Sequence, residues 1–153
     1  MSDAAAPARI TEPGRRVVLA DVVETPVDPA HCADLVADDA AGAVVTFGGV
    51  VRDHDGGRSV DHIEYSAHPD AGRIVAEVAA DIVARFPLDA IAVVHRVGAL
   101  RVGDVALAAA VSGAHRQEAF AACAELVEEI KRRLPVWKKQ QFPDGSHEWT
   151  GSA

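Results

Sequence analysis

Apolar residues recur at intervals of three or four positions in two long segments, 69–86 and 114–133, and this period predicts two amphipathic helices. In the first helix the apolar stripe consists of Ile74, Val75, Val78, Ile82 and Phe86. In the second it consists of Phe120, Cys123, Val127 and Ile130, continuing to Leu134. A proline follows each stripe, at positions 87 and 135. Because proline disfavours a helical conformation of the preceding residue, both helices should end there.

Runs of β-branched and other apolar residues predict the strands, which we place at 16–24, 42–52, 60–66, 91–97, 105–111 and 136–142. A short segment at 146–150 follows a turn at 143–145. The polar loop 53–59 should let strands 42–52 and 60–66 pair antiparallel, and the turn 98–104 should join the next two strands as a hairpin. Gly48 and Gly49 interrupt the second strand, which indicates a bulge or the close approach of another group.

A short third helix is predicted from Asp28 to about residue 37, because Asp28 suits an N-cap and Pro29 suits the first helical position. Together these elements predict an α+β fold: a mixed, mostly antiparallel sheet with two long helices and one short helix. The 153 residues are about enough for one domain. We expect residues 1–15 to form a flexible tail and residues 16–153 to form the domain.

Composition and charge exclude several classes of protein. Hydrophobic residues make up 49% of the chain, which is enough for a packed core and rules out a wholly disordered protein. The formal net charge is −8, which argues against general binding to nucleic acids or to anionic membranes. Residues 1–16 contain no apolar run of the kind found in signal peptides, and no segment is apolar for long enough to span a membrane.

The two cysteines, Cys32 and Cys123, lie far apart in the sequence among apolar neighbours. This favours buried thiols over a disulfide or a nucleophile, and it favours a reducing, cytoplasmic location. The histidines and acidic residues of the segment 53–68 match no standard metal-site spacing, so we expect them to be solvated. No metal and no cofactor is predicted.

A basic segment, residues 131–139, reverses the overall negative charge, with five basic residues out of nine. Arg132 and Arg133 fit a solvated helix end, where cations are favourable. Lys131 follows Ile130 at the edge of the apolar stripe, and Lys138 lies on the strand after the Pro135 break. Two lysines on adjoining elements can converge on one anion.

Two further places suit an anion. His115 and Arg116 stand at the start of the second long helix, where backbone N–H groups and the helix dipole favour negative charge, although a surface pair without a role explains them equally well. Arg52 follows Gly48 and Gly49 at the end of a strand, and arginine can bind phosphate through two hydrogen bonds. The pattern indicates a phosphate-bearing substrate held by arginine and lysine without a metal.

These residues carry a resemblance to a known family. The segments GAVVTFGGVVRDHDGG, IEYSAHPDAG, VVHRVGALRVGD, SGAHRQEAF and EEIKRRLPVWKKQ follow one another in the order found in the large, catalytic subunit of molybdopterin synthase, and the match covers about residues 16–150. The resemblance implies an α/β hammerhead fold. It also implies a sulfurtransferase that converts cyclic pyranopterin monophosphate to molybdopterin in molybdenum cofactor biosynthesis.

The same resemblance implies partners and residue roles. Sulfur would arrive as the C-terminal Gly-Gly thiocarboxylate of a small ubiquitin-like subunit, and two large subunits would form the central dimer of a heterotetramer. Lys131 matches the catalytic lysine, and Lys138 matches a second lysine that supports binding and turnover. The substrate-binding positions correspond to Val50, Val51, Arg52, His115, Arg116, Lys131, Lys138, Lys139 and Gln140.

Position 140 departs from the family pattern, because glutamate usually follows the Trp-Lys-Lys run and this chain has Gln140. Two alternatives therefore stay open beside the enzyme. One is a non-catalytic anion- or nucleotide-binding regulatory module. The other is an inactive scaffold that binds the partner but has lost catalysis through Gln140.

Overall fold

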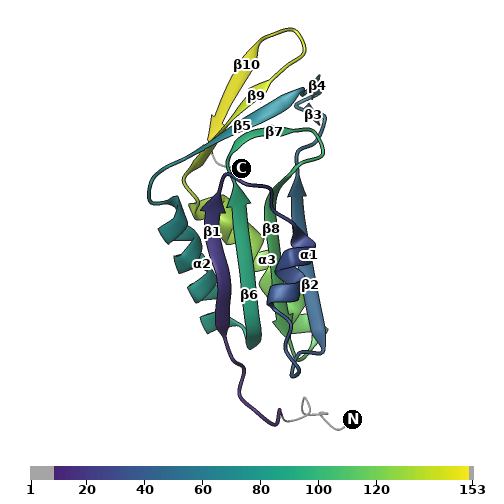
Figure 1. Ribbon diagram of the computed structural model, residues 1–153, viewed down its shortest axis with the longest axis vertical. Coiled ribbons are helices and arrows are strands. Elements are labelled where there is room, and N and C mark those ends of the chain that lie inside the picture. The colour runs from purple at the N-terminus through teal and green to yellow at the C-terminus, as the bar shows by residue number, and fades with distance from the viewer. Residues whose placement is uncertain (1–8, 152–153) are drawn as a thin grey trace.

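The computed structural model describes residues 9–151, which form two four-stranded sheets, one two-stranded hairpin and three helices (Figure 1). The larger sheet contains, in spatial order, β1 (Arg16–Val23), β6 (Leu88–Arg96), β8 (Val105–Gly113) and β2 (Ala43–Val50). Strands β1 and β6 run parallel, whereas β6 with β8 and β8 with β2 run antiparallel. The central strands β6 and β8 are buried along almost their whole length, which explains their nearly continuous apolar sequences.

Helices cover both faces of the larger sheet (Figure 1). Alternate residues of a strand point to opposite faces. On one face Ile91 and Val93 pack with α2 (Ala71–Arg85) and α3 (Arg116–Arg133) in the main hydrophobic core. On the other face Ala90 and Ala92 pack around the short helix α1 (Pro29–Leu35). The sheet is therefore the middle layer of the molecule.

The smaller sheet lies at one end of the larger one (Figure 1). Its strands, in spatial order, are β10 (His147–Gly151), β9 (Val136–Gln141), β5 (His62–Ala67) and β7 (Gly98–Arg101). All its neighbouring strands are antiparallel. A separate two-stranded hairpin consists of β3 (His54–Asp55) and β4 (Arg58–Ser59). Gly56 and Gly57 form its turn with φ of 56° and 77°, the left-handed backbone that favours glycine.

The predicted α+β class and all three predicted helices are confirmed. The hairpin of 91–97 with 105–111 is also confirmed, and the connection between its strands contains the extra strand β7. The predicted pairing of 42–52 with 60–66 is wrong, because β2 pairs with β8 while β5 pairs with β9 and β7. The segment between β2 and β5 carries the chain from one sheet to the other.

Two details of packing differ from or refine the sequence pattern. Phe120, predicted within the apolar stripe, is 61% exposed, because α3 turns Ala119, Ala122 and Leu126 toward the core instead. The glycine pair in β2 fits both of its expected roles. The ladder shifts register between Gly49 and Val50, and a Cβ at Gly48 would lie 3.2 Å from the Pro29 ring at the start of α1.

Of the expected tail 1–15, residues 1–8 lie outside the described residues. Residues 9–15 carry no helix or strand, but Arg9 forms an ion pair with the buried Asp89, and Arg15 donates a hydrogen bond of 3.0 Å to the carbonyl of Phe86. Both cysteines are buried, as predicted. No helix in the range 9–151 combines the length and apolar character that a bilayer crossing requires.

Candidate active site

A pocket of about 280 Å³ lies where the two sheets meet. Its walls come from the end of β2 and the residues after it, from the β3–β4 hairpin, from β5, β9 and the adjoining ends of β6 and β8, and from the last turn of α3. Its lining includes three cations, Arg52, Lys131 and Lys138, and the carboxylate of Asp55. This excess of positive charge in a chain of net charge −8 suits a small anion.

The two lysines reach the pocket from elements joined by Pro135. Lys131 stands in the last turn of α3, next to the buried Ile130. After the proline break, β9 pairs with β5 so that Lys138 lies opposite Tyr65 and Gln140 lies opposite Ile63. Because alternate strand residues share a face, Lys138 and Gln140 both point into the pocket.

Lys139 points to the other face of the smaller sheet, where its Nζ lies 5.6 Å from the centre of the Trp149 ring. It pairs in register with Trp149 on β10. Lys139 is therefore absent from the pocket lining, although the family resemblance placed it among the substrate-binding positions.

Arg52 follows a segment of fixed backbone. The N–H of Val51 donates to the carbonyl of Asp104 at 2.9 Å, and the carbonyl of Val51 accepts from Gly103 at 2.8 Å. The guanidinium of Arg52 is largely exposed, and its Nη2 lies 3.1 Å from Asp55 Oδ1. Val50 and Val51 form the neighbouring wall of the pocket.

The carboxylate of Asp55 is held from two sides. The buried amide of Gln140 donates from Nε2 to Asp55 Oδ2 at 2.8 Å, while Arg52 contacts the other oxygen. The hydrogen bond from Gln140 is the largest cause that lowers the pKa of Asp55, and the charges of Arg52 and Lys138 lower it further. Asp55 is thus an ionised acceptor inside a cationic pocket.

A buried histidine also lines the pocket. His95 is 1% exposed, and its Nδ1 lies 2.7 Å from the carbonyl oxygen of Arg96. Because a carbonyl only accepts, Nδ1 carries the proton and Nε2 keeps its lone pair. The ring packs edge-on against Tyr65, with centroids 5.0 Å apart. Burial lowers the pKa of His95, so the neutral form is favoured.

The other predicted anion site lies far from this pocket within one chain. His115 and Arg116 stand at the start of α3, whereas Lys131 stands near its end. Lys131 lies fifteen positions after Arg116 on the same helix, which corresponds to about 22 Å along the helix axis. Of the predicted positions, the pocket brings together Val50, Val51, Arg52, Lys131, Lys138 and Gln140.

Sequence reasoning missed four pocket residues with polar side chains: His54, Asp55, Tyr65 and His95. The segment around Asp55 was expected to be a solvated loop, which describes the exposed Asp53 and His54 but not the carboxylate that contacts Gln140. The Gly-Gly turn at 56–57 is the signal that could have indicated a hairpin. His95 lies in a strand that is otherwise apolar at 91–94, and a single polar residue in such a strand is the signal that could have indicated a functional side chain.

Within residues 9–151, no group of three or more His, Cys, Asp and Glu side chains is arranged to hold a metal ion. The polar groups of the pocket are mainly nitrogen donors, which bind oxyanions through charge-assisted hydrogen bonds. The fold and the site define the class of protein as a single α+β domain with a cationic pocket where its two sheets meet.

Comparisons with known proteins identify the family within this class. A family model described as MoaE protein matches residues 22–133. The chain is 41% identical over 117 residues to the molybdopterin synthase catalytic subunit of Nostoc sp.. This alignment covers 74% of the chain described here and 71% of the relative. The crystal structure of molybdopterin synthase from Staphylococcus aureus has a TM-score of 0.80 to this chain at 32% identity, covering 86% of this chain and 96% of that chain.

A complex of subunits 1 and 2 of the molybdopterin-converting factor from Helicobacter pylori shares the fold. Its matching chain has a TM-score of 0.67 at 15% identity, and the match covers 85% of this chain and 88% of that chain. The protein described here belongs to the MoaE protein family. This confirms the resemblance found in the sequence.

Proposed function

We propose that this chain is the catalytic subunit of a molybdopterin synthase, a cytoplasmic sulfurtransferase of molybdenum cofactor biosynthesis. Its substrate is cyclic pyranopterin monophosphate, and its product is the dithiolene-bearing molybdopterin. The observation that carries the proposal is the convergence of Arg52, Lys131 and Lys138 on one pocket in a member of this family.

In this proposal Lys131 and Lys138 are the catalytic residues. Negative charge develops when the sulfur of a thiocarboxylate attacks the pterin and the cyclic phosphate opens. Two ammonium groups fixed on α3 and β9 offset that charge where it appears. Groups placed in this way lower reaction barriers by roughly 2.7–4 kcal/mol each in well-studied acyl-transfer sites. Arg52 binds the phosphate, and Val50 and Val51 shape the adjoining wall.

The sulfur comes from outside the chain. Cys32 and Cys123 are both buried, and burial raises the pKa of each thiol, so neither is suited to act as a nucleophile. The donor we propose is the C-terminal Gly-Gly thiocarboxylate of a small ubiquitin-like subunit. The two-subunit complex from Helicobacter pylori, whose chain shares this fold, supports a small partner.

A second copy of the chain completes the site. Because His115 and Arg116 lie at the opposite end of α3 from Lys131, they serve the pocket of the other copy in a central dimer. With one small subunit on each copy, the assembly is a heterotetramer. Lys139, on the face of the smaller sheet that carries Trp149, contributes through its charge rather than through contact with the bound pterin.

The test is a reconstituted reaction. Purified chain, thiocarboxylated partner and cyclic pyranopterin monophosphate are mixed, and the dithiolene product is quantified for the wild type and for Lys131→Ala. Arg132→Ala is the matched control, because Arg132 is exposed and paired with Glu129 in the same helical turn. We expect product from the wild type and the control, and a loss of roughly 10²–10³-fold in kcat for Lys131→Ala.

Two results would contradict the proposal. Partner binding by the wild type without product would favour the inactive scaffold. Binding of the pterin phosphate or of a nucleotide, with neither partner binding nor product, would favour a regulatory module.

A further inference from the structure

The acidic residue of the pocket is Asp55, and it does not occupy the position at which the family pattern has an acid. The family resemblance leads us to expect glutamate at position 140, where this chain has Gln140. Among the described residues that line the pocket, the only acid is Asp55, which comes from the β3–β4 hairpin 85 positions earlier in the chain.

Asp55 and Gln140 are joined by a direct hydrogen bond of 2.8 Å. Gln140 is 1% exposed and sits in the middle of the smaller sheet, so its amide has little freedom to move. An ionised carboxylate only accepts hydrogen bonds, so the amide must present its NH₂ group to Asp55. The pair therefore has a defined polarity, with the acid on the hairpin and the amide on the strand.

The same carboxylate also interacts with two of the cations of the pocket, Arg52 and Lys138. Its second oxygen lies 3.1 Å from Nη2 of Arg52, which is otherwise a long, exposed side chain. Lys138 stands two residues before Gln140 on the same face of β9, and its charge acts on Asp55. One acid thus joins the phosphate-binding arginine to the strand that carries the second lysine.

We propose that Asp55 is the positioning residue of this site, and that it supplies from the hairpin the negative charge that the family pattern places at position 140. Asp55 directs Arg52 toward the pocket and balances part of the positive charge around Lys138. This inference rests on the proposed function, and it means that Gln140 is no sign of lost activity. The acid and the amide have exchanged places across one hydrogen bond.

Reversing the exchange is the sharpest test. In the double variant Asp55→Asn with Gln140→Glu, the amide oxygen introduced at position 55 still accepts from Arg52. The NH₂ group of the same amide donates to the carboxylate introduced at position 140, and the net charge is unchanged. Asp55→Asn alone removes the charge but keeps a hydrogen bond, because the amide oxygen introduced at position 55 can still accept from the Gln140 NH₂ group. Gln140→Glu alone places two carboxylates within hydrogen-bonding distance, where they repel each other.

We expect each single variant to lose about tenfold or more in kcat/KM, the scale of a lost charge-assisted hydrogen bond, and the double variant to return to within about threefold of the wild type. The matched control is Asp61→Asn, because Asp61 is an exposed acid that pairs with His62, and neither residue lines the pocket. Melting temperatures of all variants are measured alongside. Equal activity of wild type and Asp55→Asn, or a gain on Gln140→Glu alone, overturns the inference.

A second measurement does not depend on turnover. The pKa of the Asp55 carboxyl, followed by ¹³C NMR, should lie below its ordinary value in the wild type. It should rise in Gln140→Ala and rise less in Lys138→Ala, because the hydrogen bond is the larger cause. If the wild type makes no product but this pattern holds, the proposed function fails while the arrangement around Asp55 stands. If product forms and the pKa of Asp55 does not respond to either variant, the inference fails alone.

Discussion

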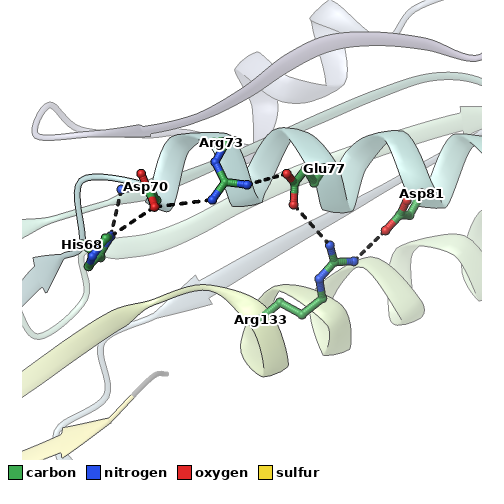
Figure 2. A network of polar contacts seen from close by, with 6 residues as sticks. All are labelled: His68, Asp70, Arg73, Glu77, Asp81 and Arg133. Atoms are coloured by element: carbon green, nitrogen blue, oxygen red, sulfur yellow. Dashed lines mark hydrogen bonds and ion pairs between the residues drawn. The ribbon is translucent and has the colours of Figure 1, made fainter.

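Arg133 Nη1 lies 2.7 Å from Asp81 Oδ2 and ties the last turn of α3 to the exposed side of α2 (Figure 2). The other guanidinium nitrogen approaches Glu77, which also pairs with Arg73 on its own helix. Arg133 stands two residues after Lys131, so this network holds the helix end from which Lys131 reaches the pocket. It does so outside the pocket, on the surface.

This position predicts a stability effect with little effect on chemistry. Arg133→Gln should lower the free energy of unfolding by about 0.2–1 kcal/mol per ion pair lost, because exposed pairs are weak and are screened by salt. Urea denaturation at low and at high salt measures it, and the difference from wild type should shrink at high salt. A loss of kcat as large as that of Lys131→Ala, with an unchanged free energy of unfolding, would show that Arg133 takes part in the reaction instead.

Arg52→Ala should act mainly on substrate binding. Its guanidinium is the phosphate ligand in our proposal, so KM should rise by about tenfold or more while kcat changes less. Steady-state kinetics with saturating thiocarboxylated partner give both constants. Arg101→Ala is the control, since Arg101 lies on β7 outside the pocket lining. An unchanged KM in Arg52→Ala would show that Arg52 does not bind the phosphate and that the phosphate site lies elsewhere.

A site shared between two copies predicts complementation. Lys131→Ala and Arg116→Ala chains should each be impaired alone, when assayed below KM. In mixed dimers one of the two sites would receive both intact residues. Random mixing then restores about a quarter of the wild-type activity, since half of the dimers are mixed and half of their sites are intact. No recovery in verified mixed dimers would show that both residues serve one chain.

Burial of His95 predicts a pH dependence of stability. Its pKa is lowered in the folded chain, whereas the unfolded chain takes up a proton near pH 6.5. Below that pH the unfolded state binds more protons, so the free energy of unfolding falls as the pH drops until the folded histidine also titrates. Urea denaturation between pH 8 and pH 5 should show this decline, and His95→Asn should reduce it. The pKa of Asp55 is lowered in the folded chain, so its contribution to the free energy of unfolding is lost only at a more acidic pH than this range.

Sequence periodicity predicted the helices and most strands because each is a local pattern. The basic segment 131–139 predicted that Lys131 and Lys138 could converge on one anion, since a helix end, a proline and a short strand lie next to one another in the chain. The alternation along β9 even separates Lys138 from Lys139, although the sequence alone did not say which face is inside.

These local patterns could not predict which strands pair when the strands are distant in the sequence. Only the short β3–β4 hairpin separates strands β2 and β5 in the sequence, yet they belong to different sheets, because β2 pairs with β8 and β5 pairs with β9. Phe120 follows the helical period yet lies outside the core, since the small side chains of Ala119 and Ala122 let α3 approach the sheet closely. The contact of Asp55 with Gln140 joins residues 85 positions apart, and only the meeting of the sheets brings them together.

The turn at Gly56 and Gly57 gives the pocket an unusual origin for its acid. A Cβ at either glycine would meet nothing within 4 Å, so the tip of this hairpin is shaped by its own backbone and not by neighbours. A change in that turn re-aims Asp55 while the buried layers keep their packing. During evolution, substitutions in this surface turn can therefore change the position of the Asp55 charge in the pocket. Substitutions in the buried strand β9 would instead require compensating changes in the core.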